Sequence, residues 1–424
     1  MTRKDSGLGP LADGGRVVII GGGPGGVAAA IALKQGARAM GREVRVIVVE
    51  GKQFAGEQQY NQCAGVLSPP IVDLIERELG VSFPHKLSRS AITGYVLHTA
   101  RREIVLDGEA GPSIALRRVQ FDAYMLDAAR ERGIEVLCAR VTGLELHADR
   151  VLIYTESTPL ESDLAVGAFG LDEGTAVLFE RTVGYRPPSA LSSVVTKYHP
   201  GEAGMIEFGS RIHAFLPPSP RIEFGGITPK GNHLTINIAG ESVDADMMEN
   251  FLAAPEVRRA LPGFENAGRF DSNDLRYFKG RFPCGLARNF SGDRFVMVGD
   301  AAGLVRAFKG KGVTSAILTG IRAANVILRE GISARAFLAY HAANRDLIDD
   351  LPYGQAMRRL TILAARIGLM DVIVRAAETD SGLRSALFDA VSAHRPYHDV
   401  VREGLTLGAV RAVLAAMPAA LAST

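Results

Sequence analysis

A glycine-rich turn near the N-terminus has the residue types and the spacing that bind a pyrophosphate. Gly21, Gly23 and Gly26 follow the G-x-G-x-x-G pattern directly after the β-branched run at residues 16–20. The first glycine permits a tight turn, the second lets backbone approach a phosphate, and the third lets a helix pack on the strand. Unpaired N–H groups and the helix dipole at the start of the next helix favour an anion. The sequence therefore predicts a strand, a turn and a helix that bind a dinucleotide.

An acidic residue ends the next predicted strand, residues 44–49. Glu50 lies a few residues beyond the usual spacing of about 20 from the glycine turn, which a longer connection over residues 35–43 explains. A carboxylate at this place can accept hydrogen bonds from a ribose diol. The alternative is a glycine-rich turn without a ligand, but strand, helix and acid together favour the dinucleotide.

A second carboxylate stands at the end of an apolar strand much later in the chain. Residues 294–298 are expected to form this strand, which leads to Gly299 and Asp300. Open α/β sheets bind ligands at the C-terminal ends of their strands, although Asp300 could instead cap the structure that follows. A helix is predicted from about Val313 to residue 329, directly after Gly310, Lys311 and Gly312.

The cysteines and histidines indicate neither a metal site nor a disulfide framework. The three cysteines are an odd number and far apart, and the nine histidines form no i, i+4 pair beside a glutamate. Cys63 lies in a polar stretch, residues 51–70, that lacks helical and strand periodicity, and such loops often carry function. Cys138 falls in a strand-like run and is expected in the core, and Cys284 is expected to have a packing role.

Composition restricts the partners of the chain. Its 424 residues are 47% hydrophobic and carry a formal net charge of +2. Nucleic acid is not expected as a partner, because its binding needs a clustered basic face. Residues 1–15 are polar and lack the apolar core of a signal peptide, which predicts a disordered tail and a cytoplasmic protein. No apolar stretch reaches the roughly 20 residues that span a bilayer, so any membrane contact is expected to be peripheral.

Periodicity divides the chain after this tail into three parts. Residues 16–181 and 280–330 alternate strands and helices as a Rossmann-like α/β unit does. Residues 182–279 contain short strand-like runs separated by Gly and Pro, with residues 205–208 among them, which predicts an inserted antiparallel sheet. Residues 331–424 are helical in pattern.

The helical C-terminal part combines apolar residues with arginines. Residues 357–370 hold Arg358, Arg359 and Arg366 among dense apolar side chains, and residues 410–421 are similarly apolar. This composition suits helices that lie in a lipid interface at the inner face of a membrane. The alternative is ordinary packing of amphipathic helices over a substrate cavity.

Several of these motifs, in the expected order, resemble the flavoprotein monooxygenase superfamily. They are the glycine turn with Glu50, Arg118 ahead of Phe121-Asp122, residues 298–303, and residues 310–312. Residues 62–69, Gln-Cys-Ala-Gly-Val-Leu-Ser-Pro, are similar to the cysteine-containing loop of the geranylgeranyl reductase family, which reduces isoprenoid double bonds with FAD. The resemblance implies an α/β fold with a Rossmann-like FAD-binding domain, an inserted antiparallel β-sheet substrate domain and a helical C-terminal region.

The segment that begins at Phe224 is similar to the Y-x-W-x-F-P segment that lines the substrate tunnel in this family. Gly226 stands at the position of the tryptophan and Thr228 at that of the phenylalanine, before Pro229, and the chain has no tryptophan. The resemblance assigns these four residues to a hydrophobic small-molecule substrate. Phe169 stands where hydroxylase relatives carry an aspartate that also serves NAD(P)H, which counts against a single-component hydroxylase.

The resemblance also implies roles for charged residues and for the cysteine. Asp300 and Arg118 would contact ribityl and pyrophosphate groups of FAD, unless Arg118 is only a surface charge at a helix start. The helix after Gly312 would face the pyrimidine edge of the flavin, with Lys311 adding charge. Cys63 would donate a proton to the alkene carbon opposite hydride delivery, or gate substrate access. Its alternative is a small buried residue.

The leading function is therefore an FAD-dependent reductase of carbon–carbon double bonds in a hydrophobic, isoprenoid-type substrate. One alternative is a flavin-dependent monooxygenase that hydroxylates its substrate through a flavin hydroperoxide. Another is a non-catalytic flavin protein for electron transfer or redox sensing. No second G-x-G-x-x-G follows a strand, so electrons are expected from transiently bound NAD(P)H or from a protein donor such as a reduced ferredoxin.

Overall fold

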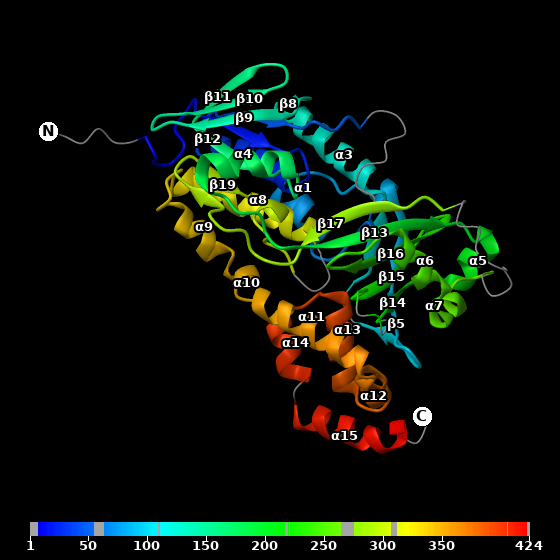
Figure 1. Cartoon of the computed structure of the whole chain (residues 1–424). Coiled ribbons are helices and arrows are strands. Elements are labelled where there is room, and N and C mark those ends of the chain that lie inside the picture. The colour runs from blue at the N-terminus through cyan, green and yellow to red at the C-terminus, as the bar shows by residue number, and fades with distance from the viewer. Residues whose placement is uncertain are drawn as a thin grey trace.

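The computed structural model describes most of the chain (Figure 1). The described residues are 7–54, 63–108, 111–216, 219, 221–263, 275–306, 312–404 and 406–421, with the backbone alone for residues 403–404 and 418–421.

A six-stranded sheet carries the glycine turn. Its strand order is β18-β19-β12-β1-β2-β8, and every pair is parallel except β18 with β19. Residues 17–20 of β1 are all buried, as expected for a parallel strand that is covered on both faces. The strands are β1 (Arg16–Ile20), β2 (Arg45–Val49), β8 (Glu135–Leu137), β12 (Leu164–Gly167), β18 (Ser291–Gly292) and β19 (Phe295–Met297).

Two long helices pack closely against each other beside this sheet (Figure 1). They are α1 (Pro24–Ala39), which is rich in alanine, and α8 (Gly312–Arg329). A Cβ atom on Gly320 of α8 would collide with the carbonyl oxygen of Gly25. Small residues therefore let the backbones of the two helices approach, which brings the N-terminus of α8 to the glycine turn. Helices α3 (Arg118–Glu131) and α4 (Glu173–Val183) complete this part.

A seven-stranded sheet forms the second layer. Its order is β17-β13-β16-β15-β14-β5-β6. One of its faces packs on a core that includes Leu234, Ile236 and Ile238. Three helices carry residues of that core: α5 (Gly201–Phe208), α6 (Ala245–Ala253) and α7 (Pro255–Ala260). The strands are β5 (Gly94–His98), β6 (Glu103–Asp107), β13 (Ala190–Tyr198), β14 (Arg211–Phe215), β15 (Phe224–Lys230), β16 (His233–Gly240) and β17 (Phe278–Pro283).

The second sheet differs from the predicted inserted antiparallel sheet in three ways. Strands β5 and β6 come from the segment predicted to belong to the cofactor-binding part, so that the division at residue 182 is wrong for residues 94–107. Strand β14 pairs with β5 in parallel, so the sheet is mixed. Residues 205–208, predicted as a strand, end helix α5, because Gly204 and Phe208 at helical spacing are the buried positions.

The predicted disordered tail is wrong for residues 7–15. Leu11 is buried, and its N–H donates to the carbonyl of Ile327 at 3.1 Å. The carbonyl of Leu8 accepts from the N–H of Ile332, and Asp13 accepts from the N–H of Glu43. Residues 7–15 are ordered because Leu8 and Leu11, although they stand in a polar stretch, anchor the segment beside α8. Residues 1–6 lie outside the described part of the chain.

Two small sheets complete the architecture. The first consists of β9 (Val141–Leu146), β10 (Val151–Thr155) and β11 (Pro159–Ser162), in which β9 and β10 form an antiparallel hairpin. The second consists of β3 (Val66–Leu67), β7 (Ser113–Leu116) and β4 (Ser88–Ile92). Short helical segments lie at α2 (Ile71–Asp73), Leu74–Glu78, His85–Leu87 and Gly299–Ala301.

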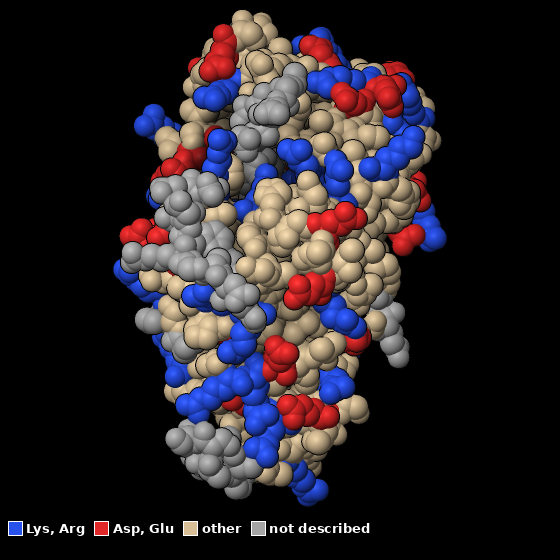
Figure 2. Space-filling view, turned by 90° about the vertical axis from the view of Figure 1, so that its right-hand side faces the viewer, with Lys and Arg blue, Asp and Glu red and all other residues tan. Residues whose placement is uncertain are grey.

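The C-terminal part is helical, as predicted. Helix α15 packs on α12 through small residues such as Ala409 and Ala416, whereas Leu407 and Leu414 are exposed. Lys and Arg side chains gather at the lower end of the molecule, where α12 and α15 lie (Figures 1 and 2). None of the described helices is long and apolar enough to cross a membrane. The helices are α9 (Phe337–Ala343), α10 (Arg345–Ile348), α11 (Leu351–Arg366), α12 (Leu369–Ala377), α13 (Ser381–Ser392), α14 (Tyr397–Gly404) and α15 (Leu407–Leu421).

A pair of histidines, His98 buried and His213 half-buried, joins β5 to β14. The Nε2 atom of His98 lies 2.9 Å from Nδ1 of His213, and the His98 ring stacks on Phe215. Burial, followed by the charges of His213 and Arg259, lowers the pKa of His98 to about 3. Burial, followed by the charge of Arg211, lowers the pKa of His213 to about 4. Both imidazoles are therefore neutral in the folded chain at pH 6.

We expect this pair to make the fold sensitive to acid. Below pH 6.5 the unfolded chain binds protons that the folded chain does not, so the free energy of unfolding falls as the pH falls toward 4. The expected slope is about 1.4 kcal/mol per pH unit for each histidine. Urea unfolding between pH 7.5 and 5 measures it. The slope should flatten in a His98→Asn chain and stay unchanged when the exposed His147 is replaced by Asn. Equal slopes in all three chains would contradict this account.

Candidate functional site

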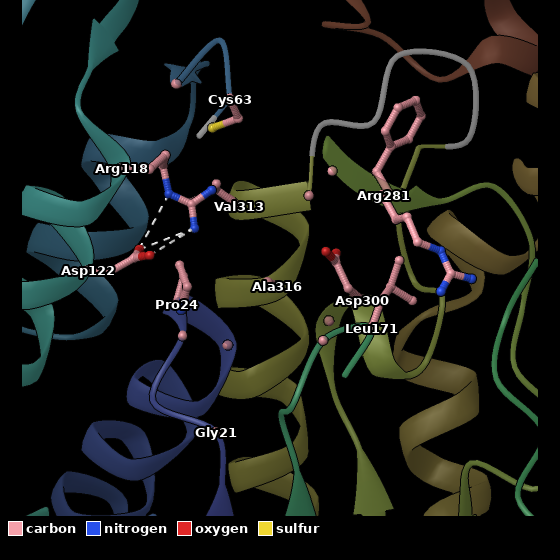
Figure 3. Close-up of a pocket in the computed structure, with 18 of the residues that line it drawn as sticks. Gly21, Pro24, Cys63, Arg118, Asp122, Leu171, Arg281, Asp300, Val313 and Ala316 are labelled. Carbon is pink, nitrogen blue, oxygen red and sulfur yellow. Dashed lines mark hydrogen bonds and ion pairs between the residues drawn. The ribbon is translucent and has the colours of Figure 1, made fainter. Parts of the chain in front are cut away.

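A cavity of about 990 Å³ lies between the C-terminal ends of the first sheet and one face of the second (Figure 3). Its lining comes from the glycine turn, the start of α8, the loop at Cys63 and strands β13, β15, β16 and β17. Figure 3 shows Cys63 and Arg118 on one side of it and Asp300 and Arg281 on the other. Segments that are distant in sequence thus meet around one space.

The three predicted glycines do three different things. Gly21 has φ +110°, and a Cβ atom there would collide with the carbonyl of Ala168. A Cβ atom on Gly26 would collide with the carbonyl of Gly21, which keeps the helix close to the turn. A Cβ atom on Gly23 would meet no heavy atom within 4 Å, because this residue borders the cavity. The first and third glycines are required by the fold, and the second is required only if a ligand approaches.

Glu50 borders the cavity and also holds the turn. Its Oε2 atom accepts a hydrogen bond from the N–H of Gly22 at 2.9 Å, and Oε1 accepts from the N–H of Lys52 at 2.8 Å. Each carboxylate oxygen keeps a second acceptor site. The arrangement therefore fixes the carboxylate at the end of β2 and leaves it able to accept from a ligand hydroxyl.

Arg118 is a half-buried side chain whose partner the sequence did not reveal. Its Nη2 atom lies 3.1 Å from Oδ1 of Asp122, one helical turn later in α3, and the Asp122 side chain is 1% exposed. Both residues line the cavity. The i, i+4 spacing of Arg118 and Asp122 was the available signal. The pair holds the guanidinium toward the cavity, so Arg118 is not a mere surface charge.

Asp300 is a half-buried side chain whose Oδ1 atom is shielded from solvent and has no hydrogen-bond partner among the described residues. Burial raises its pKa, and the positive charge of Arg118 opposes that rise. A Cβ atom on Gly312 would lie 2.9 Å from Oδ1, so a side chain there would push the carboxylate from this position. Because buried acceptors are rarely left unpaired, this oxygen indicates a ligand that donates to it. The hydroxyl-rich ribityl chain or ribose of a flavin dinucleotide fits this requirement.

The N-terminus of α8 lies beside Asp300. Val313 lines the cavity, as do Gly299 and Gly312. The N–H of Gly299 donates to Oγ1 of Thr319 in α8, which ties the carboxylate loop to the helix. Gly310 and Lys311, which were predicted to face the cofactor, lie outside the described residues.

Cys63 lines the cavity and its backbone contacts a buried lysine that no sequence motif indicated. The Nζ atom of Lys230 donates to the Cys63 carbonyl at 2.9 Å, and the lysine is 5% exposed. Burial lowers the pKa of Lys230 to about 8. Lys230 therefore fixes the loop that presents the thiol. Cys284 is buried, in keeping with a packing role, but Cys138 is exposed because strand β8 ends at Leu137.

One face of the second sheet forms the far wall. Phe224, Gly226 and Thr228 line the cavity at every second position of β15, whereas Pro229 does not. Strand pairing places Asn237 opposite Gly226, and Asn237 also lines the cavity. The neighbouring lining residues could not be predicted from sequence, because they are recognisable only once the strand register is known. They are Tyr95, Ser193, Val195, Ile212, Ala214, Asn237, Phe282 and, from α13, Val391.

The described residues contain no group of three or more His, Cys, Asp or Glu side chains that could hold a metal ion. The polar groups around the cavity are instead backbone N–H groups, carboxylates, guanidinium groups, hydroxyls and the amide of Asn237. This donor set suits an organic ligand with phosphate and hydroxyl groups.

Comparison with known proteins agrees with this geometry. No protein-family profile matches the chain. Geranylgeranyl diphosphate reductase of the chloroplast of Nicotiana tabacum is 25% identical over 339 residues, which are 74% of this chain and 66% of the tobacco protein.

Solved structures share the fold. A geranylgeranyl bacteriochlorophyll reductase-like protein of Thermoplasma acidophilum is 17% identical, with a TM-score of 0.71 over 93% of this chain and 99% of that one. A p-nitrophenol 4-monooxygenase of Pseudomonas putida is 15% identical, with a TM-score of 0.63 over 92% of this chain and 97% of that one. The predicted α/β fold is confirmed, and the predicted resemblance to a geranylgeranyl reductase is borne out by the similarity to the tobacco protein and by the shared fold.

Proposed function

We propose, on the premise that the chain is a flavin-dependent oxidoreductase homologous to geranylgeranyl reductase, that it binds FAD and reduces carbon–carbon double bonds of a hydrophobic, isoprenoid-type substrate. The observation that carries the proposal is the continuous cavity that joins the glycine turn and Asp300 to Cys63 and the sheet wall. Its volume of about 990 Å³ is at the upper end of the usual range for one ligand. A cofactor and a substrate would share it.

The residues of the first sheet fit FAD. The backbone at Gly23 would lie against the pyrophosphate, and Glu50 would accept from a ribose diol. Asp300 would use its unpaired oxygen to accept from a hydroxyl, and Arg118 would donate to a phosphate. The start of α8 would place the positive end of a helix dipole beside the ring. A bound flavin would supply hydride transfer to the substrate.

The other side of the cavity would hold the substrate and supply a proton. Phe224, Phe282, Val195 and Ile212 give an apolar surface that keeps water away from the reacting bond. Reduction of an alkene adds a hydride to one carbon and a proton to the other. Cys63 would hold that proton on its thiol, and Lys230 would keep its loop in place through the carbonyl contact. The proposal therefore gives Cys63 a catalytic role and Lys230 a positioning role.

Hydroxylation is the second candidate, and the polar part of the wall favours it. Asn237, Thr228 and Ser193 can orient a polar substrate such as a phenol. Phe169 counts against hydroxylation, because hydroxylase relatives carry an aspartate at this position. The Phe169 ring instead stacks on Phe179, with 5.5 Å between the ring centroids, and makes no polar contact. The two reactions differ in whether molecular oxygen is consumed.

An anaerobic oxidation assay tests the proposal. We expect purified protein to bind FAD, to be reduced by light, and then to be reoxidised by a polyprenyl alkene in the absence of oxygen, with two hydrogens gained per double bond. A Cys63→Ala chain should bind FAD normally and reoxidise at least about 100-fold more slowly with the alkene, the scale of a lost general acid. Cys138→Ala is the matched control and should behave as the wild type.

Other results would contradict the proposal in different ways. Oxygen consumption with a hydroxylated product, and no reoxidation by alkenes, would establish the second candidate. Rapid reduction without turnover of alkene or oxygen would indicate an electron-transfer protein. Comparison of NADH, NADPH and reduced ferredoxin in the same assay identifies the electron donor.

A further inference from the structure

We propose that a recess in the cavity wall at Gly226 binds the oxygen of an α,β-unsaturated carbonyl group, with the amide of Asn237 and the hydroxyl of Thr228 as its hydrogen-bond donors. The inference rests on the proposed function, because it takes the cavity as the place where a carbon–carbon double bond is reduced. It adds the chemical class of the substrate, which is an isoprenoid-type enone and not an isolated alkene.

The strand register brings the two donors to one place on the wall. Asn237 of β16 stands opposite Gly226 of β15, and Thr228 follows Gly226 by two residues on the same strand. Alternate residues of a strand share a face, so all three positions face the cavity that they line. Diagonal neighbours of this kind lie about 7 to 8 Å apart. An amide and a hydroxyl at these positions can therefore reach the same ligand oxygen.

Small residues leave room for that oxygen beside the amide. Gly226 has no side chain, and Ala214 is paired with it on β14 and also lines the cavity. A Cβ atom on Gly226 would lie 3.1 Å from Oδ1 and 3.7 Å from Nδ2 of Asn237. The amide thus borders the space that a side chain at position 226 would fill. Phe224 and Val195 adjoin this space on the wall, so the recess is a polar notch in an apolar surface.

Both donors lack a hydrogen-bond partner within the described part of the chain. Neither the amide of Asn237 nor the hydroxyl of Thr228 forms a side-chain hydrogen bond there. Thr228 is 2% exposed and Asn237 is half-buried, and both line the cavity. Buried polar groups are rarely left unpaired in native structures. A ligand that accepts hydrogen bonds in the recess would satisfy both.

A neutral carbonyl oxygen matches the recess better than a bare hydrocarbon or an anion. A hydrocarbon chain would leave both donors unpaired on a buried surface, which costs free energy. An anion would lose its water shell against two uncharged donors, which do not neutralise it. A carbonyl oxygen has two acceptor sites, one for each donor. The hydrocarbon part of such a substrate would lie on the apolar wall.

Conjugation of the carbonyl group with the double bond lets the donors act on the reaction itself. Addition of the hydride to the β-carbon breaks the π bond and moves an electron pair onto the carbonyl oxygen. Fixed hydrogen-bond donors stabilise negative charge where it develops in a transition state. The α-carbon then takes the proton that the proposed function assigns to Cys63, and the carbonyl group is restored. The product has gained one hydride and one proton.

Titration of the oxidised, flavin-loaded chain with two matched probes tests the recess, and the change in flavin absorbance reports binding. The probes are pseudoionone, an acyclic isoprenoid enone, and its hydrocarbon analogue, in which a methylene group replaces the carbonyl. We expect the wild type to bind the enone at least about tenfold more tightly. Asn237→Leu should weaken enone binding about tenfold or more, and Thr228→Val about threefold to tenfold. Neither change should weaken binding of the hydrocarbon.

The different responses of the two probes distinguish recognition of the oxygen from a folding defect. Asn250→Leu is the matched control, since Asn250 is exposed on α6 and does not line the cavity. In anaerobic single-turnover mixing, reduced Asn237→Leu protein should be reoxidised by saturating enone about 100-fold more slowly than the wild type, the scale of a lost oxyanion donor. Asn250→Leu should match the wild type in both measurements.

The outcomes for the recess are separate from those for the proposed function. Equal affinity of the wild type for the two probes, or an enone preference that persists in Asn237→Leu, overturns the recess. Reoxidation by a polyprenyl alkene but not by the enone overturns the substrate class and leaves the proposed function standing. An Asn237-dependent enone preference in a protein that reduces neither compound supports the carbonyl site and contradicts the proposed function.

Discussion

An Asp300→Asn chain is expected to bind FAD about tenfold to a hundredfold more weakly than the wild type, the usual cost of losing a hydrogen bond to a charged group. Its flavin-free form is expected to be at least as stable as the wild type. The Oδ1 atom of the half-buried Asp300 is shielded from solvent and has no hydrogen-bond partner among the described residues. A buried carboxylate without a partner costs free energy in the folded chain, and an amide of the same shape removes the charge.

The pH dependence gives a second signature of the same residue. Burial raises the pKa of Asp300 above that of the unfolded chain, so the folded chain holds this proton more tightly and the carboxyl group costs the fold most at high pH. The stability advantage of Asp300→Asn over the wild type should therefore be largest near neutral pH and shrink on acidification. FAD fluorescence titration and urea unfolding of the flavin-free chain measure the two effects.

An exposed carboxylate serves as the control for Asp300. Asp127 lies on the outside of α3, where it pairs with Arg130, and Asp127→Asn should change neither FAD affinity nor the pH dependence. A stability loss in Asp300→Asn with unchanged FAD affinity would mean that the carboxylate serves the fold. Asp300 would then not belong to the proposed cofactor site.

Local sequence patterns predicted the residues proposed to bind the cofactor. They did not predict most of the cavity wall that the second sheet forms. The glycine turn, Glu50 and Asp300 each follow a strand directly, so a few neighbouring residues determine their positions. The same holds for α8, whose start at Gly312 agrees with the predicted helix. Their convergence on one cavity follows from the parallel pairing of β1, β2, β12 and β19, because parallel strands deliver their C-terminal ends to the same edge.

The polar wall depends on contacts between distant segments. Ser193, Thr228 and Asn237 come together on one face only through the pairing of β13, β15 and β16, and no local pattern encodes that register. The parallel pairing of β5 with β14 is likewise non-local, which is why residues 94–107 were assigned to the wrong part. Cys138 was misplaced for a different reason. A run of strand-like residues does not show where the strand ends, and β8 ends at Leu137.

A Gly23→Ala chain is expected to fold as the wild type does and to lose most of its affinity for FAD. The backbone of Gly23 has φ −71° and ψ 177°, which alanine adopts without strain. A Cβ atom there would meet no protein atom within 4 Å. The free energy of unfolding of the flavin-free chain should stay equal or rise by about 0.4 to 1 kcal/mol, because alanine restricts the unfolded state. Any loss of binding must then come from contact with the ligand.

The neighbouring glycine is the matched comparison. Gly26→Ala would place a Cβ atom against the carbonyl of Gly21, so we expect this chain to lose several kcal/mol of stability, on the order of an overpacked core, with or without FAD. Gly23→Ala should instead weaken FAD binding on the order of tenfold or more, because the second glycine of the pattern is where the pyrophosphate approaches backbone. Urea unfolding and FAD titration of both chains separate the effects. If Gly23→Ala binds FAD as tightly as the wild type, the pyrophosphate does not lie against this turn, and the cofactor orientation proposed for the whole cavity is wrong.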